Sequence, residues 1–254
     1  MPSLLEVKDL GVRFGGVVAL DKVSFAVQAG ETVALIGPNG AGKTTLFNVI
    51  TRIYRPSTGT VLLDGNSVLA IRPHNVIRHG LARTFQNVAL FRSMTVLDNV
   101  LVGDHSRTRS GWLQASVPLP DATRAESGSR KRAIEMIEFV GLGPQANRPV
   151  AVLPFGLQKR VELARALVSR PRIILLDEPA GGISQAEVDS TSRLLKRVHD
   201  ELGVTMLLVE HHMAFVMGIS DRVIVLDFGK KIAEGTPAEV QHNQAVIEAY
   251  LGAA

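Results

Sequence analysis

The stretch Val33–Ile50 reads VALIGPNGAGKTTLFNVI, with the spacing G-x-x-x-x-G-K-[ST] between Gly37 and Thr44. The apolar run Val33–Ile36 predicts a buried strand, and Leu46–Ile50 is typical of a helix. A glycine-rich turn between a strand and a helix directs several backbone N–H groups and the helix N-terminus at one place. The pattern therefore predicts an α/β fold in which this loop binds a polyphosphate.

The loop carries the side chains that phosphate binding needs. Gly37, Gly40 and Gly42 let the backbone bend and approach phosphates closely. Lys43 is placed to reach the β- and γ-phosphates, and the Thr44 hydroxyl is placed to ligate Mg²⁺. A chance glycine turn would lack the flanking strand and helix, so we call residues 37–45 the phosphate loop. The expected nucleotide contacts in it are Gly37, Pro38, Asn39, Gly40, Ala41, Gly42, Lys43, Thr44 and Thr45.

Composition limits the classes of protein to consider. The chain has 254 residues, 46% of them apolar, which is enough for a sizeable core. It has no cysteine, which excludes disulfides and thiolate metal sites. Its basic residues are scattered despite a net charge of +4, so we expect no nucleic-acid binding. The start MPSLLEVKDL lacks an apolar signal region, and apolar runs fall short of the roughly 20 residues that span a bilayer. We expect a cytoplasmic protein that reaches a membrane through a partner.

Strand and helix patterns alternate along the chain. The first forty residues predict a β-rich layer, extended by a hairpin that turns at Asp64-Gly65. Helical patterns occupy residues 95–142, interrupted by the polar stretch 105–130. We expect this stretch to be a solvated loop, with a loop facing a partner or membrane as the alternative. Strand patterns return later, as in a parallel sheet covered by helices, at residues 173–177, 205–209 and 223–226.

Two short segments near the end have local signatures. Thr236-Pro-Ala-Glu239 predicts a capping box, followed by a helix from Pro237 to about Tyr250. Asp227-Phe-Gly229 spells the magnesium motif of protein kinases, but it lies between two strand patterns and predicts a hairpin turn.

A second set of candidate residues follows the strand pattern at 173–177. The carboxylates of Asp177 and Glu178 end this strand, and parallel sheets bind ligands at that edge. We expect Asp177 to reach Mg²⁺ through a water and Glu178 to polarise a water for attack on the γ-phosphate. The alternative is an acidic strand end that caps the next helix.

With both sets in place, the chain resembles the ATP-binding-cassette (ABC) ATPases over essentially its whole length. Gln86 in ARTFQN matches the glutamine that contacts Mg²⁺ and the attacking water in that family. Phe14 matches the aromatic residue that stacks on adenine, and His211 matches the histidine that holds the γ-phosphate. The resemblance implies catalytic roles for Glu178, His211 and Gln86, whereas His212 reads as structural.

The family signature L-S-G-G-Q corresponds to Leu153–Leu157, which reads LPFGL and which we call the signature segment. The resemblance implies that Phe155 and Gly156 contact the nucleotide bound by a second subunit. The segment after it, RVELARAL, is fully typical. The loop sequences resemble those of the ATPases of branched-chain amino-acid importers, and they include Ser184 where many members of the wider family have aspartate.

The resemblance implies one nucleotide-binding domain over residues 1–254. It would have a RecA-like P-loop NTPase core with an antiparallel β layer, residues 1–88 and 168–254, and a helical subdomain with the signature, residues 89–167. The implied ligands are ATP and Mg²⁺. The implied partners are transmembrane permease subunits, a second ATPase subunit as homodimer or heterodimer, and indirectly a periplasmic binding protein, with the chain on the inner face of the membrane.

Three other functions stay open from the sequence. The chain could serve an exporter of lipopolysaccharide or another lipid-linked cargo, because other subunits choose the cargo. A soluble ABC ATPase acting on DNA or ribosomes usually has two cassettes or a long coiled coil, and this chain shows one phosphate loop and no sustained heptads. A regulatory subunit without turnover is disfavoured by Glu178 and His211.

Overall fold

The computed structural model describes residues 3–84, 89–105 and 120–251, with the side chains of 120–125 and 251 left out. The chain divides into two compact units. Unit 1 comprises residues 1–76 and 172–254, and unit 2 comprises residues 77–171. Within the described ranges, no helix has both the length and the apolar composition that crossing a membrane requires.

The first sheet of unit 1 is antiparallel and has the strand order β2-β1-β4-β5. It confirms the predicted β-rich layer. Asp64 and Gly65 form the turn between β4 and β5 with φ angles of 52° and 73°, as the sequence predicted for this hairpin. The strands are β1 (Ser3–Phe14), β2 (Val17–Gln28), β4 (Thr58–Leu63) and β5 (Asn66–Ser67).

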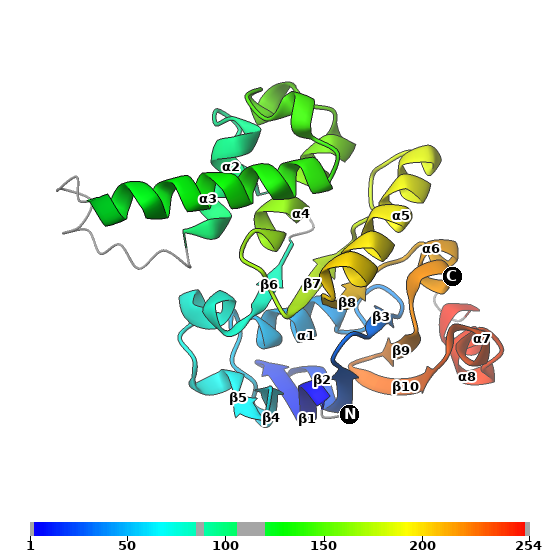
Figure 1. Cartoon of the computed structure of the whole chain (residues 1–254). Coiled ribbons are helices and arrows are strands. Elements are labelled where there is room, and N and C mark those ends of the chain that lie inside the picture. The colour runs from blue at the N-terminus through cyan, green and yellow to red at the C-terminus, as the bar shows by residue number, and fades with distance from the viewer. Residues whose placement is uncertain (1–2, 85–88, 106–119, 252–254) are drawn as a thin grey trace. The chain divides into compact units, whose positions relative to one another are not determined.

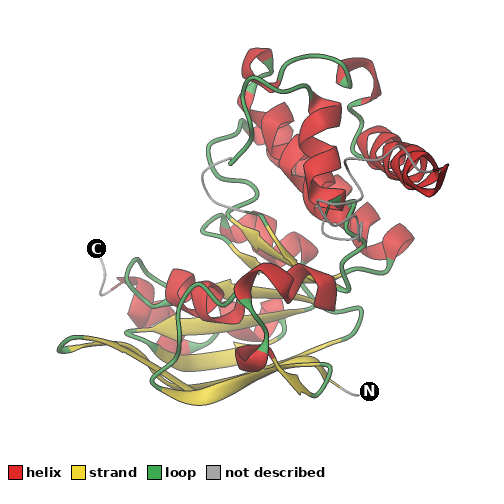
Figure 2. Ribbon diagram, turned by 90° about the vertical axis from the view of Figure 1, so that its left-hand side faces the viewer, coloured by secondary structure: helices red, strands yellow, loops and turns green. Residues whose placement is uncertain are grey.

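The second sheet of unit 1 contains the strands predicted to be buried. Its order within the unit is β10-β9-β3-β8-β7, with parallel pairing except between β9 and β10. Every residue of β3, β7 and β8 is buried, which explains their continuous apolar sequences. Figure 2 shows the strands of this unit in two layers with helices beside them. The strands are β3 (Thr32–Ile36), β7 (Ile173–Asp177), β8 (Thr205–Val209), β9 (Arg222–Asp227) and β10 (Lys230–Gly235).

The helices of unit 1 follow the strands of the second sheet. They are α1 (Lys43–Ile50), α5 (Gln185–Leu202), α6 (Met213–Ile219), α7 (Pro237–Gln241) and α8 (Gln244–Leu251). Helix α5 begins with a capping box in which Ser184 and Glu187 bond each other's backbone N–H. Ser184 therefore starts this helix. Short 3-10 turns lie at Val68–Ala70 (η1), in unit 1, and at Pro73–His79 (η2), which runs from unit 1 into unit 2.

Unit 2 is largely helical. Its helices α2 (Val96–Asp104), α3 (Pro120–Phe139) and α4 (Phe155–Leu167) pack on one another, as Figure 1 shows. The Arg132 Nη2 atom lies 2.6 Å from the carboxylate of Asp104, which is 1% exposed, so an ion pair ties α3 to α2. The unit also contains β6 (Leu81–Arg83) and the 3-10 turns η3 (Gly143–Gln145) and η4 (Val150–Val152).

The predicted loop at residues 105–130 is wrong for its second half. Residues 120–130 form the first part of α3, whereas residues 106–119 lie outside the described residues. This part of α3 has no apolar periodicity, so its sequence gave no helical signal. Pro120 suits a first helical position, and Arg132 bonds Ser129 as well as Asp104, which supports the polar turns of the helix.

The predicted C-terminal helix is also wrong in its length. The capping box at Thr236 and Glu239 is confirmed, but α7 ends at Gln241 and α8 starts anew at Gln244. The break is made by Asn243, whose Oδ1 atom accepts the backbone N–H groups of Ala245 at 3.0 Å and Val246 at 3.4 Å. An asparagine that caps downstream N–H groups starts a helix.

The hairpin predicted at Asp227–Gly229 is confirmed. Strands β9 and β10 are antiparallel, and the turn residues Phe228 and Gly229 have φ angles of 42° and 78°. The Gly229 N–H donates to the carbonyl oxygen of Ala41 at 3.1 Å, and the Gly229 carbonyl accepts from Asp21 N–H at 2.8 Å. This turn therefore braces the phosphate loop against the first sheet.

Candidate functional site

The carboxyl ends of β3, β8 and β7 lie level at one edge of the second sheet. Leu35 on β3 pairs with Val209 on β8, and Val209 pairs with Asp177 on β7. The segments that follow these strands are the phosphate loop, residues 210–212 and residues 178–184, respectively. Open α/β sheets bind ligands at this edge, so the fold brings candidate residues from three distant segments together.

The phosphate loop needs its glycines for two different reasons. Gly37, Gly40 and Gly42 have φ angles of 149°, 81° and 101°, a region that other residues rarely adopt. In addition, a Cβ atom on Gly37 would lie 2.0 Å from the Leu226 carbonyl oxygen, and one on Gly42 would lie 2.7 Å from that of Ala19. The loop is therefore held in one shape by backbone packed closely behind it.

The Lys43 side chain folds back along the phosphate loop. Its amino group donates to the carbonyl oxygens of Gly37 at 2.6 Å and Pro38 at 2.8 Å. Burial lowers the pKa of Lys43, and the charge of Glu178 acts in the opposite direction. Helix α1 has no side-chain cap at Gly42 and no acidic residue in its first turn, so nothing there offsets its positive end. The loop thus concentrates positive charge and N–H donors for an anion.

The other side chains of the loop differ in their exposure. Thr44 and Asn39 are exposed, Thr45 and Pro38 are half-buried, and Ala41 is buried. The Thr44 hydroxyl is therefore accessible to a ligand at the start of α1, whereas Ala41 serves packing.

Asp177 and Glu178 differ in environment although they are neighbours. Asp177 is 5% exposed at the end of β7. Glu178 is half-buried and has a φ angle of 50°, and its N–H donates to the Val209 carbonyl at 2.9 Å. A non-glycine residue with positive φ after a strand stores strain, which structures retain mostly at functional positions. Both carboxylates therefore lie at the carboxyl end of β7, Asp177 buried and Glu178 half-buried.

Glu178 and His211 are brought together. The His211 Nε2 atom lies 3.4 Å from Glu178 Oε1, and about two fifths of the His211 side chain, 43%, is exposed. A Cβ atom on Gly181 would lie 3.3 Å from the Glu178 side chain, so the glycine leaves room for it. A carboxylate beside an accessible imidazole is an arrangement that can orient a water and hold a phosphate oxygen.

Sequence reasoning missed Glu210, which is 2% exposed beneath this pair. Its carboxylate accepts the backbone N–H groups of Ala180 at 2.6 Å, His211 at 2.8 Å and His212 at 3.2 Å. It therefore ties the segment after β7 to the segment after β8. An acidic residue directly after a fully apolar strand was the available signal. The structural reading of His212 is confirmed, because its Nδ1 atom caps α6 by accepting the Phe215 N–H.

Phe14 lies at the end of β1 and is 46% exposed. The ring of Tyr54 meets it edge-on, with centroids 5.2 Å apart and an interplanar angle of 73°. Val17 and Val18 are also exposed next to this strand end. An exposed aromatic face fixed by a second ring suits stacking by a planar group. Tyr54 was not predicted, because only its contact with Phe14 identifies it.

The signature segment belongs to unit 2 and starts α4. Pro154 is the N-cap residue and supplies no side-chain cap, and Phe155 is 44% exposed. The Lys159 amino group lies 5.4 Å from the centre of the Phe155 ring. Gly156 lies in the first turn of α4. The remaining candidate, Gln86, lies outside the described residues.

The residues at the sheet edge fit a magnesium ion that takes some of its ligands from the protein and the others from a bound substrate and water. Thr44 offers an accessible hydroxyl and Asp177 a carboxylate. In the part of the chain that the structure describes, no three His, Asp or Glu side chains form a group that could hold a metal alone. Mg²⁺ usually keeps waters and substrate phosphate oxygens and takes only one or two carboxylates, so this sparse set suits it.

Comparisons with known proteins place the chain in a family. The ABC transporter family matches residues 20–181, and the family described as branched-chain amino acid ATP-binding cassette transporter matches residues 230–254. The chain is similar to the high-affinity branched-chain amino acid transport ATP-binding protein BraF of Pseudomonas aeruginosa. The two are 42% identical over 251 residues, which cover 99% of this chain and 98% of BraF.

Solved structures share the architecture. A crystal structure of the ADP conformation of an ATP-binding cassette of an ABC transporter superposes with a TM-score of 0.85 at 30% identity, covering 99% of this chain and 100% of the other. A dimeric ATP-binding cassette bound to ADP and Pi superposes with a TM-score of 0.77 at 26% identity, covering 92% and 98%. The chain therefore belongs to the ABC transporter family and has the P-loop NTPase fold of that family's ATP-binding cassettes.

Proposed function

We propose that this chain is the ATP-binding and ATP-hydrolysing motor subunit of an ABC transporter that imports branched-chain or similar amino acids. One observation carries the ATPase proposal: the phosphate loop with Lys43 and the Glu178–His211 pair meet at one edge of one sheet. The likeness to BraF and the match of residues 230–254 to the branched-chain family support import of that cargo.

Each residue at the sheet edge has a distinct task in this proposal. Lys43 exchanges its bonds to the Gly37 and Pro38 carbonyls for bonds to the β- and γ-phosphates, so loop carbonyls hold the cation until substrate arrives. Glu178 polarises the attacking water, and His211, beside it, donates to a γ-phosphate oxygen. Catalysis is then mainly positioning and charge stabilisation.

Thr44 and Asp177 would hold a magnesium ion, Asp177 through a water, and the family resemblance adds Gln86 to this set. A bound Mg²⁺ would supply positive charge that offsets the charge of the phosphates. Phe14 stacks on the adenine, and the edge-on ring of Tyr54 keeps Phe14 in place.

The second half of the ATP site comes from another subunit. We propose that residues 1–88 and 168–254 form a RecA-like core with a β layer, and that residues 89–167 form the helical subdomain with the signature segment. Phe155 and Gly156 of one subunit close on the nucleotide held by the phosphate loop of the next. Transmembrane permease subunits hold this dimer, of identical or related chains, at the inner face of the membrane, and a periplasmic binding protein delivers the cargo.

Two substitutions test the two halves of the proposed ATP site one at a time. Lys43→Ala should weaken ATP binding at least tenfold, because a charge-assisted phosphate contact of about 1.5–3 kcal/mol is lost. The matched control is Lys196→Ala, an exposed lysine on α5. Gly156→Asp should leave ATP binding intact and abolish ATP-driven dimerisation, measured by light scattering, because a carboxylate would face the γ-phosphate.

Cargo and direction need the assembled transporter. Proteins that co-purify from detergent-solubilised membranes should include a permease and an amino-acid receptor. ATP-dependent uptake of radiolabelled leucine by vesicles with the complex would support import. ATP-dependent extrusion of a lipid-linked cargo would replace that part of the proposal with an exporter.

A further inference from the structure

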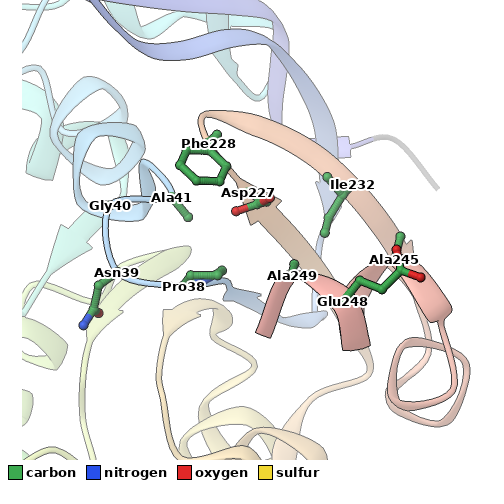
Figure 3. A pocket seen from close by; sticks show the side chains of 10 residues that line it. All are labelled: Pro38, Asn39, Gly40, Ala41, Asp227, Phe228, Ile232, Ala245, Glu248 and Ala249. Atoms are coloured by element: carbon green, nitrogen blue, oxygen red, sulfur yellow. The ribbon is translucent and has the colours of Figure 1, made fainter. Parts of the chain in front are cut away.

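Helix α8 lies over the outer side of the phosphate loop. One cavity of about 460 Å³ separates loop residues 38–41 from α8, and Figure 3 shows both walls of it. A second cavity, of about 620 Å³, lies between Ile36, the last residue of β3, and helices α6, α7 and α8. The side chains that α8 contributes to these cavities are Ala245, Glu248 and Ala249 to the first, and Val246, Ile247 and Tyr250 to the second.

Tyr250 of α8 lines the second cavity together with Ile36, the residue before Gly37. Its hydroxyl oxygen is shielded from solvent and has no hydrogen bond of standard geometry within the described residues. The backbone of Gly37 lies close enough to act on it: burial raises the pKa of Tyr250, and a backbone interaction with Gly37 opposes that rise. A buried hydroxyl left without a full hydrogen bond is costly, so a small shift of Gly37 toward it would be favourable.

Gly37 is held differently on its other side. There the Leu226 carbonyl of β9 leaves no room for a Cβ atom, and the Gly229 N–H bonds the Ala41 carbonyl further along the loop. The hairpin backbone therefore packs directly against the backbone of the loop at Gly37 and Ala41. No such backbone contact joins α8 to the loop within the described residues, and the first cavity, which hairpin side chains also line, leaves room for the loop to adjust toward α8.

Helix α8 starts separately from α7. Asn243 caps its first turn, and Val246 is 7% exposed. The position of Tyr250 is therefore set by a helix with its own start and its own apolar contacts. This helix falls in residues 230–254, the segment that matches the branched-chain family.

We propose that Tyr250 is a positioning residue for the phosphate loop, and that its hydroxyl completes a bond to the Gly37 backbone when the loop holds a nucleotide. The inference rests on the proposed nucleotide site. Helix α8 would then set the nucleotide affinity of the loop from outside the site, without touching substrate.

The test is Tyr250→Phe in the full chain, with binding of ADP and Mg²⁺ measured by isothermal titration calorimetry. The phenyl ring keeps the packing and removes only the hydroxyl, so we expect affinity to fall about five- to tenfold, as for one neutral hydrogen bond. The melting temperature without nucleotide should stay equal or rise, because a poorly bonded buried hydroxyl is removed. The matched control is Ile247→Val, which trims the same cavity and should change affinity less than twofold.

Equal affinity of wild type and Tyr250→Phe would overturn the inference. Equal loss in Tyr250→Phe and Ile247→Val would also overturn it, because packing of α8 and not the hydroxyl would then matter. Lys43→Ala separates this result from the proposed function: if it loses binding while Tyr250→Phe does not, only the inference fails. If wild type binds no nucleotide, both fail.

Discussion

Replacing Glu210 with alanine should destabilise the folded chain severely. The side chain is 2% exposed and accepts three backbone N–H groups, those of Ala180, His211 and His212. Hydrogen bonds to a charged group contribute about 1.5–3 kcal/mol each, and buried donors left unpaired cost about 1–3 kcal/mol each. Because contributions within one network are not additive, we expect a loss of about 3–5 kcal/mol of unfolding free energy.

Glu210→Gln should lose less, about 1.5–3 kcal/mol. The amide keeps one acceptor oxygen, but its NH₂ group faces at least one backbone donor. Urea unfolding followed by far-ultraviolet circular dichroism measures both variants. Glu201→Gln, at an exposed position of α5, is the control and should lose less than about 0.5 kcal/mol, because it removes only an exposed ion pair with Arg197.

The functional readout follows from the same contacts. Glu210 joins the backbone beside Glu178 to that of His211, so Glu210→Gln should lower ATP turnover by more than it lowers ATP affinity. A loss of under about 1 kcal/mol for Glu210→Ala would refute the reasoning, because the three donors would then have other acceptors.

Other expected outcomes follow from single contacts. Gly42→Ala should destabilise the chain by about 1–3 kcal/mol more than Gly40→Ala in urea unfolding, because both strain the backbone but only Gly42 has a carbonyl, that of Ala19, in the way of a Cβ atom. Burial raises the pKa of Tyr250 above its ordinary value of 10.0, so the unfolded chain releases this proton at lower pH than the folded chain does. Stability should therefore fall as pH rises past that value, and Tyr250→Phe should lack this part of the loss in thermal melts. Asn243→Ala should cost about 1 kcal/mol through lost capping of α8, whereas Asn243→Asp should be tolerated.

The sequence predicted the parts of the fold that depend on local pattern. Two such parts are the strand, loop and helix at residues 33–50 and the strand that ends at Asp177. Their apolar patterns and the glycine or acidic residues that end them can be recognised without any tertiary contact. Their meeting at one edge followed from parallel pairing alone. The roles expected of Glu178 and His211 were stated without placing the two residues side by side, and the structure brings their side chains to 3.4 Å.

Most of the missed features depend on contacts between distant segments, and one depends on a local side-chain cap. Glu210 bonds the backbone N–H of Ala180, thirty residues away, and Tyr54 is distinguished only by the ring of Phe14. The start of α3 is polar and has no apolar periodicity that would predict a helix. The ion pair between Arg132 of α3 and Asp104 of α2 is a tertiary contact that the sequence pattern does not reveal. The break before α8 comes from a side-chain cap at Asn243 inside an otherwise helical pattern.

The central claim is that Glu178 activates water at a nucleotide site built on the phosphate loop. The most direct measurement compares wild type and Glu178→Gln in two quantities, the dissociation constant for ATP with Mg²⁺ and the rate of phosphate release. The amide is nearly isosteric with the carboxylate but cannot polarise water as it does. The account predicts unchanged binding within about threefold and turnover reduced at least a hundredfold, with the variant collecting as an ATP-bound dimer. Hydrolysis by Glu178→Gln within a few-fold of wild type would contradict it.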